Sequence, residues 1–275
     1  MLLKSDGASL YTTTDLATIV ERMKLFQPDE ILYVVDKRQE IHFIQVFRCA
    51  RKTGLVKEDT RLSFLGFGTM NGKDGKPFKT REGGVMRLEN LIADIDEEMF
   101  TKIVENRSVR DKDARDTAKI VGLAAIKYGD LSNQATKDYI FDVDRFTSFE
   151  GNTGPYILYT IVRIKSILNR YVEAGGNLEA GEILPASNSS EKNLMLQLSG
   201  FGSMIESAFE EKAPHKICAY IYEVSNAFNS FYHETKILSE ENQAQKESYI
   251  RLLQLTKRVL ETSIDLLGFE APDKM

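Results

Sequence analysis

The chain has 275 residues, of which 42% are hydrophobic and 28% are charged, and its formal net charge at pH 7 is -5. This length is enough for about two domains, and the negative charge argues against indiscriminate binding to nucleic acid. No apolar run approaches the roughly 20 residues that span a bilayer, and the amino terminus lacks the hydrophobic region of a secretion signal. We therefore expect a cytoplasmic protein that is not in a membrane.

The cysteine and histidine content limits disulfide and metal chemistry. Cys49 and Cys218 are too few and too far apart in sequence for a disulfide framework. Only His42, His215 and His233 could join them in a metal site. We expect free thiols and no metal bound by the protein itself.

The first hundred residues alternate between helix and strand patterns. Residues 16–26 have apolar side chains at helical spacing, and Asp15 precedes them. Residues 31–35 form a continuous β-branched and aromatic run, typical of a buried parallel strand. Residues 39–52 predict a second helix and residues 61–67 a second strand, so the segment predicts a βαβ unit.

A glycine-rich, lysine-bearing segment follows the second strand, at residues 72–84. Glycines allow positive φ and a close approach to a ligand, and Lys76, Lys79 and Arg81 supply charge for a polyphosphate. The segment leaves the carboxyl end of a parallel strand, where ligands collect in open α/β sheets. Asp-Gly and Gly-Gly are equally ordinary in the turn of a solvated β-hairpin. The residues alone leave both interpretations open.

Beyond about residue 85, helical periodicity replaces the strand patterns. Helices are expected at 114–128, 155–171, 191–210, 216–238 and 243–267. Thr153 can cap the clearest of them, 155–171. Arg163, Lys165 and Arg170 form a basic stretch on that helix, a pattern that most often marks a solvated face. The fold class is α/β plus all-α, a partial parallel sheet followed by a helical bundle.

Several short motifs occur in the order in which arginyl-tRNA synthetases carry them. They are YTTTDLA (11–17), YVVDKRQEIHF (33–43), GFG (66–68), FKTR (78–81), GNTGPY (151–156) and the ending LLGF (266–269) with Pro272 and Met275. No single motif is decisive, but their shared order extends over nearly the whole chain. The chain therefore resembles the arginyl-tRNA synthetase family.

The resemblance implies a class I arginine-tRNA ligase, which activates arginine with ATP, with Mg²⁺ expected, and transfers it to tRNA. Residues 1–105 would be the second half of a Rossmann-type catalytic domain. Residues 106–150 would be a connecting helical region, and residues 151–275 a helical anticodon-binding domain.

Three arginine-pocket residues follow from the resemblance: Tyr11, Asp15 and Gln39. Their chemistry fits, because a carboxylate can accept paired hydrogen bonds from a guanidinium, an amide oxygen can accept another, and an aromatic ring can pack near the cation. Each also has a structural alternative. Asp15 could cap a helix, Tyr11 could be a core aromatic, and Gln39 could start a helix.

The resemblance also implies ATP contacts at His42, Phe67, Gly68 and Thr80. His42 follows Gln39 by three positions, so the two side chains can share a helix face. A lone histidine on a largely apolar helix is more often a packed structural residue, and core packing explains Phe67 equally well.

A degenerate form of the class I Lys-Met-Ser-Lys-Ser motif occupies residues 77–81, with Thr80 in place of the second lysine. We expect Lys79, Lys76 or Arg81 to offset the charge that develops as pyrophosphate leaves. Which cation does so is open.

In the helical part, Tyr232, Tyr249 and Met275 are the candidate tRNA contacts. Aromatic rings such as these, and those of Phe228 and Phe231, could stack on splayed bases. For each ring, core packing is the more common explanation.

One expected motif is missing. The chain has no pair of histidines spaced as in the His-Ile-Gly-His signature with which class I synthetases hold ATP. We therefore expect a carboxyl-terminal portion whose partner is the missing amino-terminal half, and whose half sheet exposes apolar edges. The alternatives are a non-catalytic tRNA-binding helical module and a helical scaffold without an RNA partner.

Overall fold

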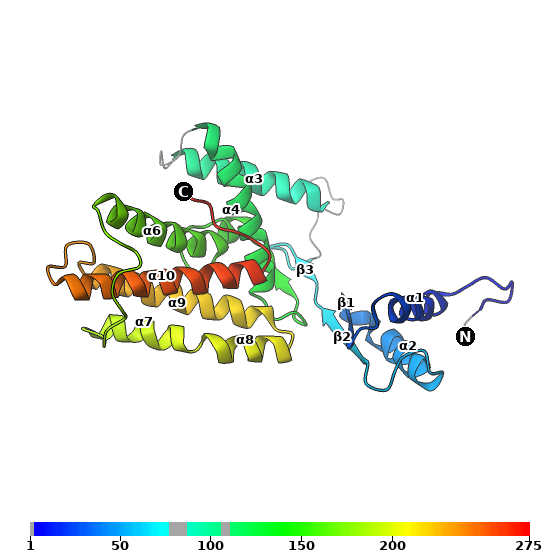
Figure 1. The fold of residues 1–275 in the computed structure, drawn as a ribbon. Helices are drawn as coiled ribbons and strands as arrows, with labels where there is room; N and C mark the ends of the chain where they lie inside the picture. Colours follow the sequence, from blue (N-terminus) through cyan, green and yellow to red (C-terminus); the bar gives the residue numbers. More distant parts are fainter. Residues whose placement is uncertain (1–2, 77–86, 106–110) are drawn as a thin grey trace. The chain divides into compact units, whose positions relative to one another are not determined.

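Figure 1 shows the computed structural model of the chain, which describes residues 3–76, 87–105 and 111–275. The chain forms two compact units. Unit 1 comprises Met1–Met70 and Ala135–Tyr139, and unit 2 comprises Asn71–Gln134 and Ile140–Met275. The limits of the two units follow from which residues pack together, and they do not define functional domains. The functional ranges 1–105, 106–150 and 151–275 remain a proposal.

Unit 1 contains the predicted βαβ unit. Strands β1 (Glu30–Asp36) and β2 (Arg61–Phe67) pair in parallel, from Glu30 opposite Arg61 to Asp36 opposite Phe67. A short 3-10 turn, η1 (Lys37–Gln39), leads from β1 into the crossover helix α2 (Glu40–Lys52). The prediction is confirmed because the β-branched run of β1 and the helical spacing of α2 agree with their tertiary surroundings.

Helix α1 (Tyr11–Phe26) begins earlier than the apolar pattern indicates. Its N-cap residue is Leu10, whose amide donates to Thr13 Oγ1 at 3.4 Å. Asp15 therefore lies within the helix, and its interpretation as a cap is wrong. Helices α1 and α2 and strand β1 contribute to one core, which consists of Leu16, Ile19, Ile31, Tyr33, Phe43, Val46, Ala50 and Val56.

The core covers one face of β1 and leaves the other open. Burial alternates along the strand: Ile31 and Tyr33 are buried, whereas Leu32 is 40% exposed and Val34 is 55% exposed. Among the described residues, β2 is the one strand that pairs with β1, so the other edge of β1 has no partner strand. The predicted exposure of apolar edges is present here.

A hollow of about 480 Å³ runs beside β1. Residues 30–35 all line it, together with Arg22, Phe26 and Pro28. Successive residues of a strand point to opposite faces, so a hollow lined by all of them follows the strand's edge. We call it the β1 groove.

A return segment, Ala135–Tyr139, completes unit 1 at the carboxyl ends of the strands. The Thr69 amide and the Lys37 ammonium donate to Asp138 Oδ1 at 2.7 and 2.9 Å. The short strands β3 (Met70–Asn71) and β4 (Tyr139–Ile140) pair beside this segment. Each of these strands has only 2 residues, which is too short for an alternating sequence pattern to predict a strand.

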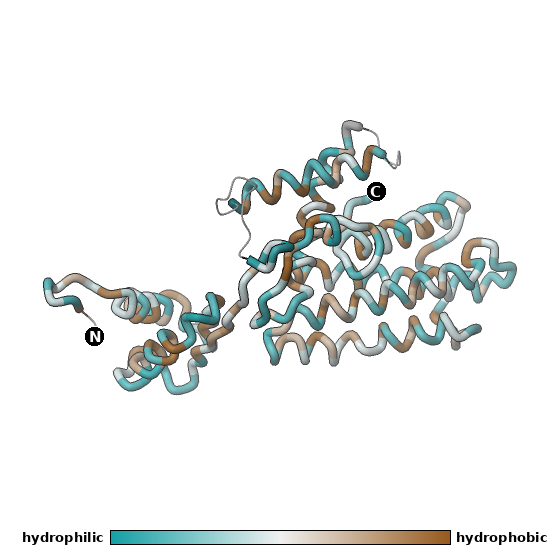
Figure 2. The backbone as a smooth tube through the Cα atoms, turned by 180° about the vertical axis from the view of Figure 1, so that it is seen from behind, coloured by the Kyte–Doolittle hydropathy of each residue, from teal (hydrophilic) through white to brown (hydrophobic). Residues whose placement is uncertain are grey.

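Unit 2 is helical. Its described helices are α3 (Leu88–Glu105), α4 (Asp111–Leu131), α5 (Val143–Phe146), α6 (Gly154–Glu173), α7 (Ser189–Ser199), α8 (Phe201–Glu210), α9 (Pro214–Glu234) and α10 (Gln243–Leu266). Helix α6 packs against α4, α9 and α10. Apolar and polar segments alternate along these helices (Figure 2), as expected when each helix buries one side.

The structure confirms most of the expected helices and corrects one. Thr153 caps α6, because its hydroxyl accepts the Tyr156 amide at 3.2 Å. The helix expected at 191–210 is two helices that meet at Gly200. None of the described helices combines the length and the apolar content that crossing a bilayer requires.

Candidate functional site

A short polar contact in unit 1 joins α1 to α2. Asp15 Oδ2 lies 2.6 Å from His42 Nε2, and each side chain is 29% exposed. Because a carboxylate accepts and does not donate, the ring N–H of His42 is the donor. The ring of His42 also packs edge-on against Phe43, with 5.1 Å between the ring centroids. Asp15 is therefore held by hydrogen bonding and remains open to a ligand.

Tyr11 and Gln39 each lie about one turn from this pair. Tyr11 is the first residue of α1, four positions before Asp15, and it is 86% exposed. Gln39 ends η1, three positions before His42, and it is exposed. Residues three or four apart share a helix face. The Asp15–His42 contact therefore joins the two helix faces that carry the three predicted arginine-pocket residues, and Tyr11 is not a core aromatic.

Tyr33 of β1 contributes a phenol that packs against Phe43, with 4.7 Å between the ring centroids. Burial raises the pKa of the Tyr33 hydroxyl, and the nearby Asp15 carboxylate raises it further. Arg22, whose guanidinium carbon lies 5.2 Å from the centre of the Tyr33 ring, opposes the shift. Tyr33 is thus a neutral phenol within electrostatic range of the Asp15 carboxylate.

The two residues predicted to meet adenine lie at the end of β2. Phe67 is 43% exposed. The Gly68 amide donates to the carbonyl of Ala135 at 2.8 Å, so this N–H is already engaged. A side chain at Gly68 would collide with the carbonyl oxygen of Lys137, which lies 2.3 Å from the position of a Cβ atom. Here glycine is required by the close approach of the return segment.

The glycine-lysine segment is described only as far as Lys76. The Gly72 amide donates to the carbonyl of Lys76 at 2.8 Å, and Gly75 has a φ of +71°. Residues 72–76 thus form a tight turn, which is the ordinary interpretation for this part. The Lys76 side chain is exposed. Lys79, Thr80 and Arg81 lie outside the described residues, so the phosphate interpretation of the segment stays a prediction.

The three candidate tRNA contacts have different surroundings. Tyr232 of α9 is 36% exposed. Tyr249 of α10 is 3% exposed, and its hydroxyl lies 2.9 Å from Ser187 Oγ. A ring without an exposed face cannot stack on a base, so Tyr249 is a core residue in this structure. Met275 is partly buried at the end of the chain. Phe228 and Phe231 are fully buried.

A polar and aromatic surface surrounds Tyr232. The guanidinium of Arg163 on α6 lies between two rings, 4.7 Å from the centre of Tyr159 and 5.2 Å from the centre of Tyr232. Arg163 Nη1 donates to Asn229 Oδ1 at 2.8 Å, and Asn229 Nδ2 donates to the Tyr156 hydroxyl at 2.8 Å. We call these five residues the Arg163 patch.

The Arg163 patch suits unpaired bases. Tyr159 is 40% exposed and Tyr232 is 36% exposed, so both rings that flank Arg163 reach the surface. Exposed rings and a planar guanidinium are the side chains on which bases stack. The sequence contains a pattern that could have indicated this surface, because Tyr156, Tyr159 and Arg163 are spaced along one helix face. The sequence interpretation instead treated Arg163 as part of a basic, solvated stretch.

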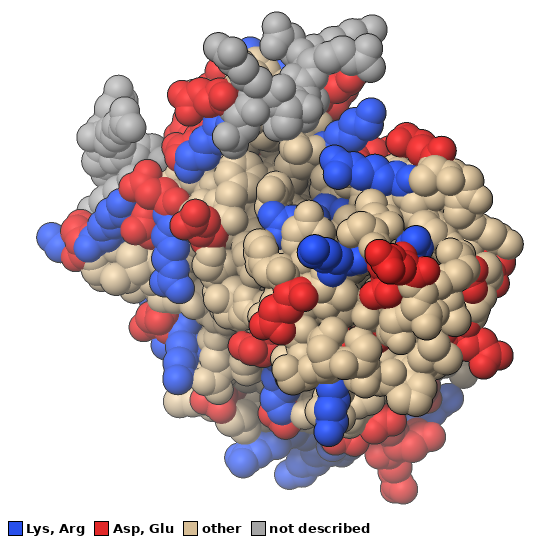
Figure 3. Space-filling view, turned by 90° about the vertical axis from the view of Figure 1, so that its left-hand side faces the viewer, with Lys and Arg blue, Asp and Glu red and all other residues tan. Residues whose placement is uncertain are grey.

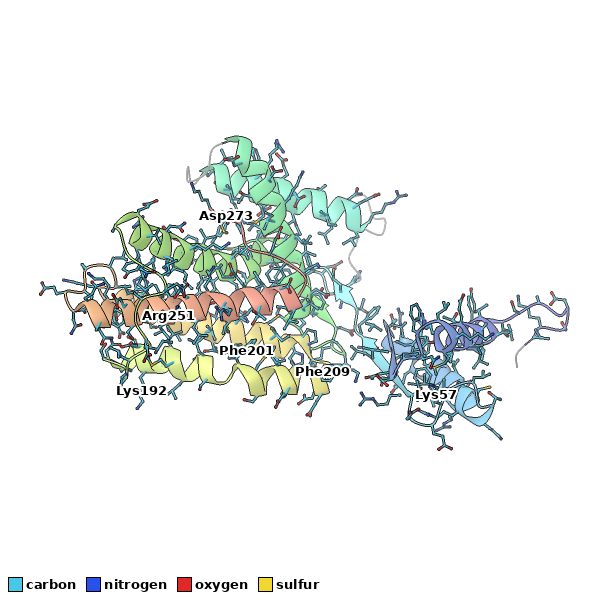
Figure 4. The ribbon with its side chains drawn as sticks, in the orientation of Figure 1. Lys57, Lys192, Phe201, Phe209, Arg251 and Asp273 are labelled. Carbon is cyan, nitrogen blue, oxygen red and sulfur yellow. The ribbon has the colours of Figure 1, made fainter. Side chains whose placement is uncertain are left out.

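Lys165, two residues further on, serves another purpose. It is 18% exposed, and its ammonium donates to the carbonyls of Ala271 and Pro272, both at 3.3 Å. It also lies 3.5 Å from Glu261 and from Asp273. Figures 1 and 4 show the chain beyond α10 turning back across the helices, with Asp273 on it. We call residues 268–275 the tail, and Lys165 holds it in place.

A second hollow, of about 470 Å³, lies between α10 and the loop before α7. Arg251 and Arg258 line it, and so do Glu179 and Glu182 (Figure 4 labels Arg251). Arg251 is engaged, because it donates to the carbonyl of Leu178 at 3.2 Å. On the face that Figure 3 shows, acidic and basic side chains are interspersed. Because two arginines and two glutamates line the hollow, its charge does not favour the binding of an anion.

Among the described residues, no three His, Cys, Asp or Glu side chains are grouped so that they could hold a metal ion. Cys49 and Cys218 are free thiols, as predicted. Burial raises the pKa of the Cys218 thiol to about 12, so at neutral pH it is not a nucleophile.

Comparison with known families divides the chain in two. Residues 1–143 match the family described as "tRNA synthetases class I (R), catalytic domain". Residues 157–275 match the family described as "DALR anticodon binding domain". The two matches follow each other along the chain.

The curated relatives that match the whole chain are arginine--tRNA ligases. An arginine--tRNA ligase from Agathobacter rectalis is 66% identical over 283 residues, and one from Alkaliphilus oremlandii is 58% identical over 275 residues. Each match covers 100% of this chain and 47% of the relative. The chain thus spans about half the length of the curated relatives it matches.

Solved structures support the fold. The arginyl-tRNA synthetase from Plasmodium falciparum superposes with a TM-score of 0.84 at 27% identity, covering 100% of this chain and 46% of that protein. The one from Thermus thermophilus superposes with a TM-score of 0.85 at 23% identity, covering 100% of this chain and 50% of that protein. By its catalytic-domain match and these relatives, the chain belongs to the class I tRNA synthetases of the arginine type.

Proposed function

We propose that the chain is the carboxyl-terminal part of an arginine-tRNA ligase, which joins arginine to tRNA at the expense of ATP. The observation that supports this most is the family membership over both units. The site geometry is compatible with it, since Asp15 and Gln39 come from two helices that contact each other through His42.

In this proposal, each arginine-pocket residue has a separate task. The Asp15 carboxylate accepts paired hydrogen bonds from the guanidinium of the substrate, and the Gln39 amide oxygen accepts another. The exposed ring of Tyr11 covers the cation. Such contacts hold arginine so that its carboxylate can meet the α-phosphate of ATP.

ATP and Mg²⁺ enter the same proposal as substrates. We propose that Mg²⁺ arrives on the phosphates of ATP, because this ion keeps several waters and usually binds through phosphates and few protein oxygens. The cations Lys76, Lys79 and Arg81 offset charge on the departing pyrophosphate. Phe67, Gly68 and Thr80 remain the proposed ATP contacts, whereas the hydrogen bond of His42 to Asp15 favours another role for His42. The cytoplasmic location stays a prediction.

The proposed partner of unit 1 is the amino-terminal half that the longer relatives carry. The unpaired edge of β1 and the β1 groove suit a neighbouring strand, because backbone groups at a sheet edge need hydrogen-bond partners. The exposed apolar side chains of Leu32 and Val34 would also gain from cover. We therefore expect the isolated chain to lack adenylate formation.

A non-catalytic tRNA-binding module is the second candidate. It is favoured by the Arg163 patch, whose side chains all come from this chain, whereas Tyr11 of the proposed arginine pocket is 86% exposed. In this candidate, Tyr232 and Met275 contact the anticodon loop, and Tyr249 supports them from the core.

One experiment separates the two candidates. The purified chain is assayed for binding to arginine tRNA and to unrelated tRNAs at several salt concentrations, because phosphate contacts weaken with salt. It is then mixed with the amino-terminal portion of the Agathobacter rectalis relative and assayed for charging of tRNA with arginine. Charging supports the ligase, selective binding without charging supports the module, and absence of both refutes both proposals.

A further inference from the structure

We infer that His42 is a positioning residue for the arginine-binding carboxylate of Asp15 and not a contact for ATP. This inference rests on the proposed function, and it deepens it. The observation is the 2.6 Å hydrogen bond from His42 Nε2 to Asp15 Oδ2, between residues 27 positions apart. Both side chains are 29% exposed, so the pair lies at the edge of the protein interior, where a ligand can reach it.

The hydrogen bond fixes how the carboxylate presents itself. An ionised carboxylate has two oxygens and about four acceptor sites. The N–H of His42 occupies one site on Oδ2 and holds the side chain in one rotamer. The remaining sites, including those on Oδ1, then point in a fixed direction. Paired hydrogen bonds with a guanidinium need such a fixed direction, because the donors of arginine form a rigid fork.

The same contact sets the spacing between the pocket residues. Asp15 belongs to α1, whereas His42 and Gln39 belong to the start of α2 and to the turn before it. The apolar contacts of the core, such as those of Leu16 and Phe43, hold the helices together. They do not fix the direction of the Asp15 side chain, which is 29% exposed. His42 is the described side chain that hydrogen-bonds to it.

This role predicts an effect on specificity. If the carboxylate is no longer oriented, a single ammonium can still approach it from many directions, but a planar guanidinium loses its paired bonds. Loss of His42 should therefore weaken the binding of arginine more than the binding of lysine. A nucleotide contact would instead affect ATP.

The first test uses the chain itself. The imidazole of His42 is followed by nuclear magnetic resonance while arginine, lysine or ATP is added. We expect a saturable shift with arginine, with a dissociation constant in about the millimolar range, and none with ATP. Asp15→Asn should remove the shift. A shift with ATP alone, or with none of the three, would overturn the inference.

The second test uses the enzyme reconstituted with the amino-terminal portion of the Agathobacter rectalis relative. His42→Leu should raise KM for arginine about tenfold and leave KM for ATP within about twofold. His42→Gln, whose amide can still donate to Asp15, should recover part of the loss. Gln45→Leu, at an exposed position of the same helix, is the matched control and should change neither constant.

The outcomes separate the inference from the proposed function. If the reconstituted wild type does not charge tRNA, the proposed function fails, and the resonance titration still decides the role of His42. If His42→Leu raises KM for ATP, or lowers thermal stability with both constants unchanged, His42 is a nucleotide contact or a purely structural residue, and the inference is wrong.

Discussion

Replacing Arg163 by methionine tests the Arg163 patch. In the free protein, Arg163 makes two ring contacts and one hydrogen bond to Asn229. Ring contacts at exposed sites contribute about 0.5–1 kcal/mol each. A partly exposed hydrogen bond adds about 1 kcal/mol, and methionine retains much of the packing of the arginine stem. We expect the free energy of unfolding of unit 2 to fall by about 2–3 kcal/mol.

The substitution should also weaken RNA binding. Loss of one stacking contact with a base costs about 1–3 kcal/mol, which is a factor of about 5 to 150 in the dissociation constant. Arg163→Lys keeps the charge and loses the planar fork, so it should recover little of this affinity. Fluorescence anisotropy with arginine tRNA measures the dissociation constants, and urea unfolding confirms that each variant is folded.

The matched control is Arg170→Met, which removes the same charge from an exposed position of the same helix. It should weaken binding by less than about threefold and mainly reduce the salt dependence. If Arg163→Met binds tRNA as tightly as the wild type while it is folded, or if Arg163→Lys restores full affinity, the stacking argument for this surface is wrong.

Three further predictions concern contacts in the two units. Tyr128 is fully buried and its hydroxyl donates to the carbonyl of Cys218 at 2.8 Å, so Tyr128→Phe should lower the free energy of unfolding by about 1–3 kcal/mol in urea; an unchanged midpoint would contradict this. Lys165→Met should speed removal of the tail by carboxypeptidase, whereas Lys257→Met, which loses a contact to the same Glu261, should not. Equal rates for both variants would show that Lys165 does not anchor the tail. The hydrogen bond from Lys37 lowers the pKa of Asp138 in the folded protein. The stability that this carboxylate provides is therefore fully present above its pKa in the unfolded chain, about 3.9. This stability is lost as the pH falls through the lower pKa of the folded protein. Lys37→Met should raise that folded pKa toward the unfolded one, and an unchanged Asp138 titration by nuclear magnetic resonance would refute the assignment.

The sequence predicts the elements of unit 1 because local and tertiary preferences agree there. The β-branched run at residues 31–35 is a strand in any buried setting, and its pairing with β2 follows from the crossover helix. The start of α1 could not be predicted, because Leu10 is not a typical N-cap residue and the threonines after it resemble a loop. The break at Gly200 was missed for a related reason, since the apolar pattern continues through it.

The sequence indicates candidate site residues, which stay predictions, and it does not indicate their contacts. Tyr232 and Tyr249 look alike in sequence, as tyrosines on amphipathic helices, but tertiary packing exposes the first and buries the second. The Asp15–His42 hydrogen bond joins positions 27 residues apart, and no local pattern indicates it. The amide of Gly68 is engaged by a return segment that is more than 60 residues away in sequence. Such contacts depend on the fold as a whole.

The β1 groove has a consequence for inhibitor discovery. A short extended peptide with small apolar residues at alternate positions could lie along β1, bond to its main chain and fill the hollow of about 480 Å³. Such a compound would compete with the strand that we propose to cover β1, and not with a metabolite. Its potency would therefore not decline when cellular arginine or ATP is abundant.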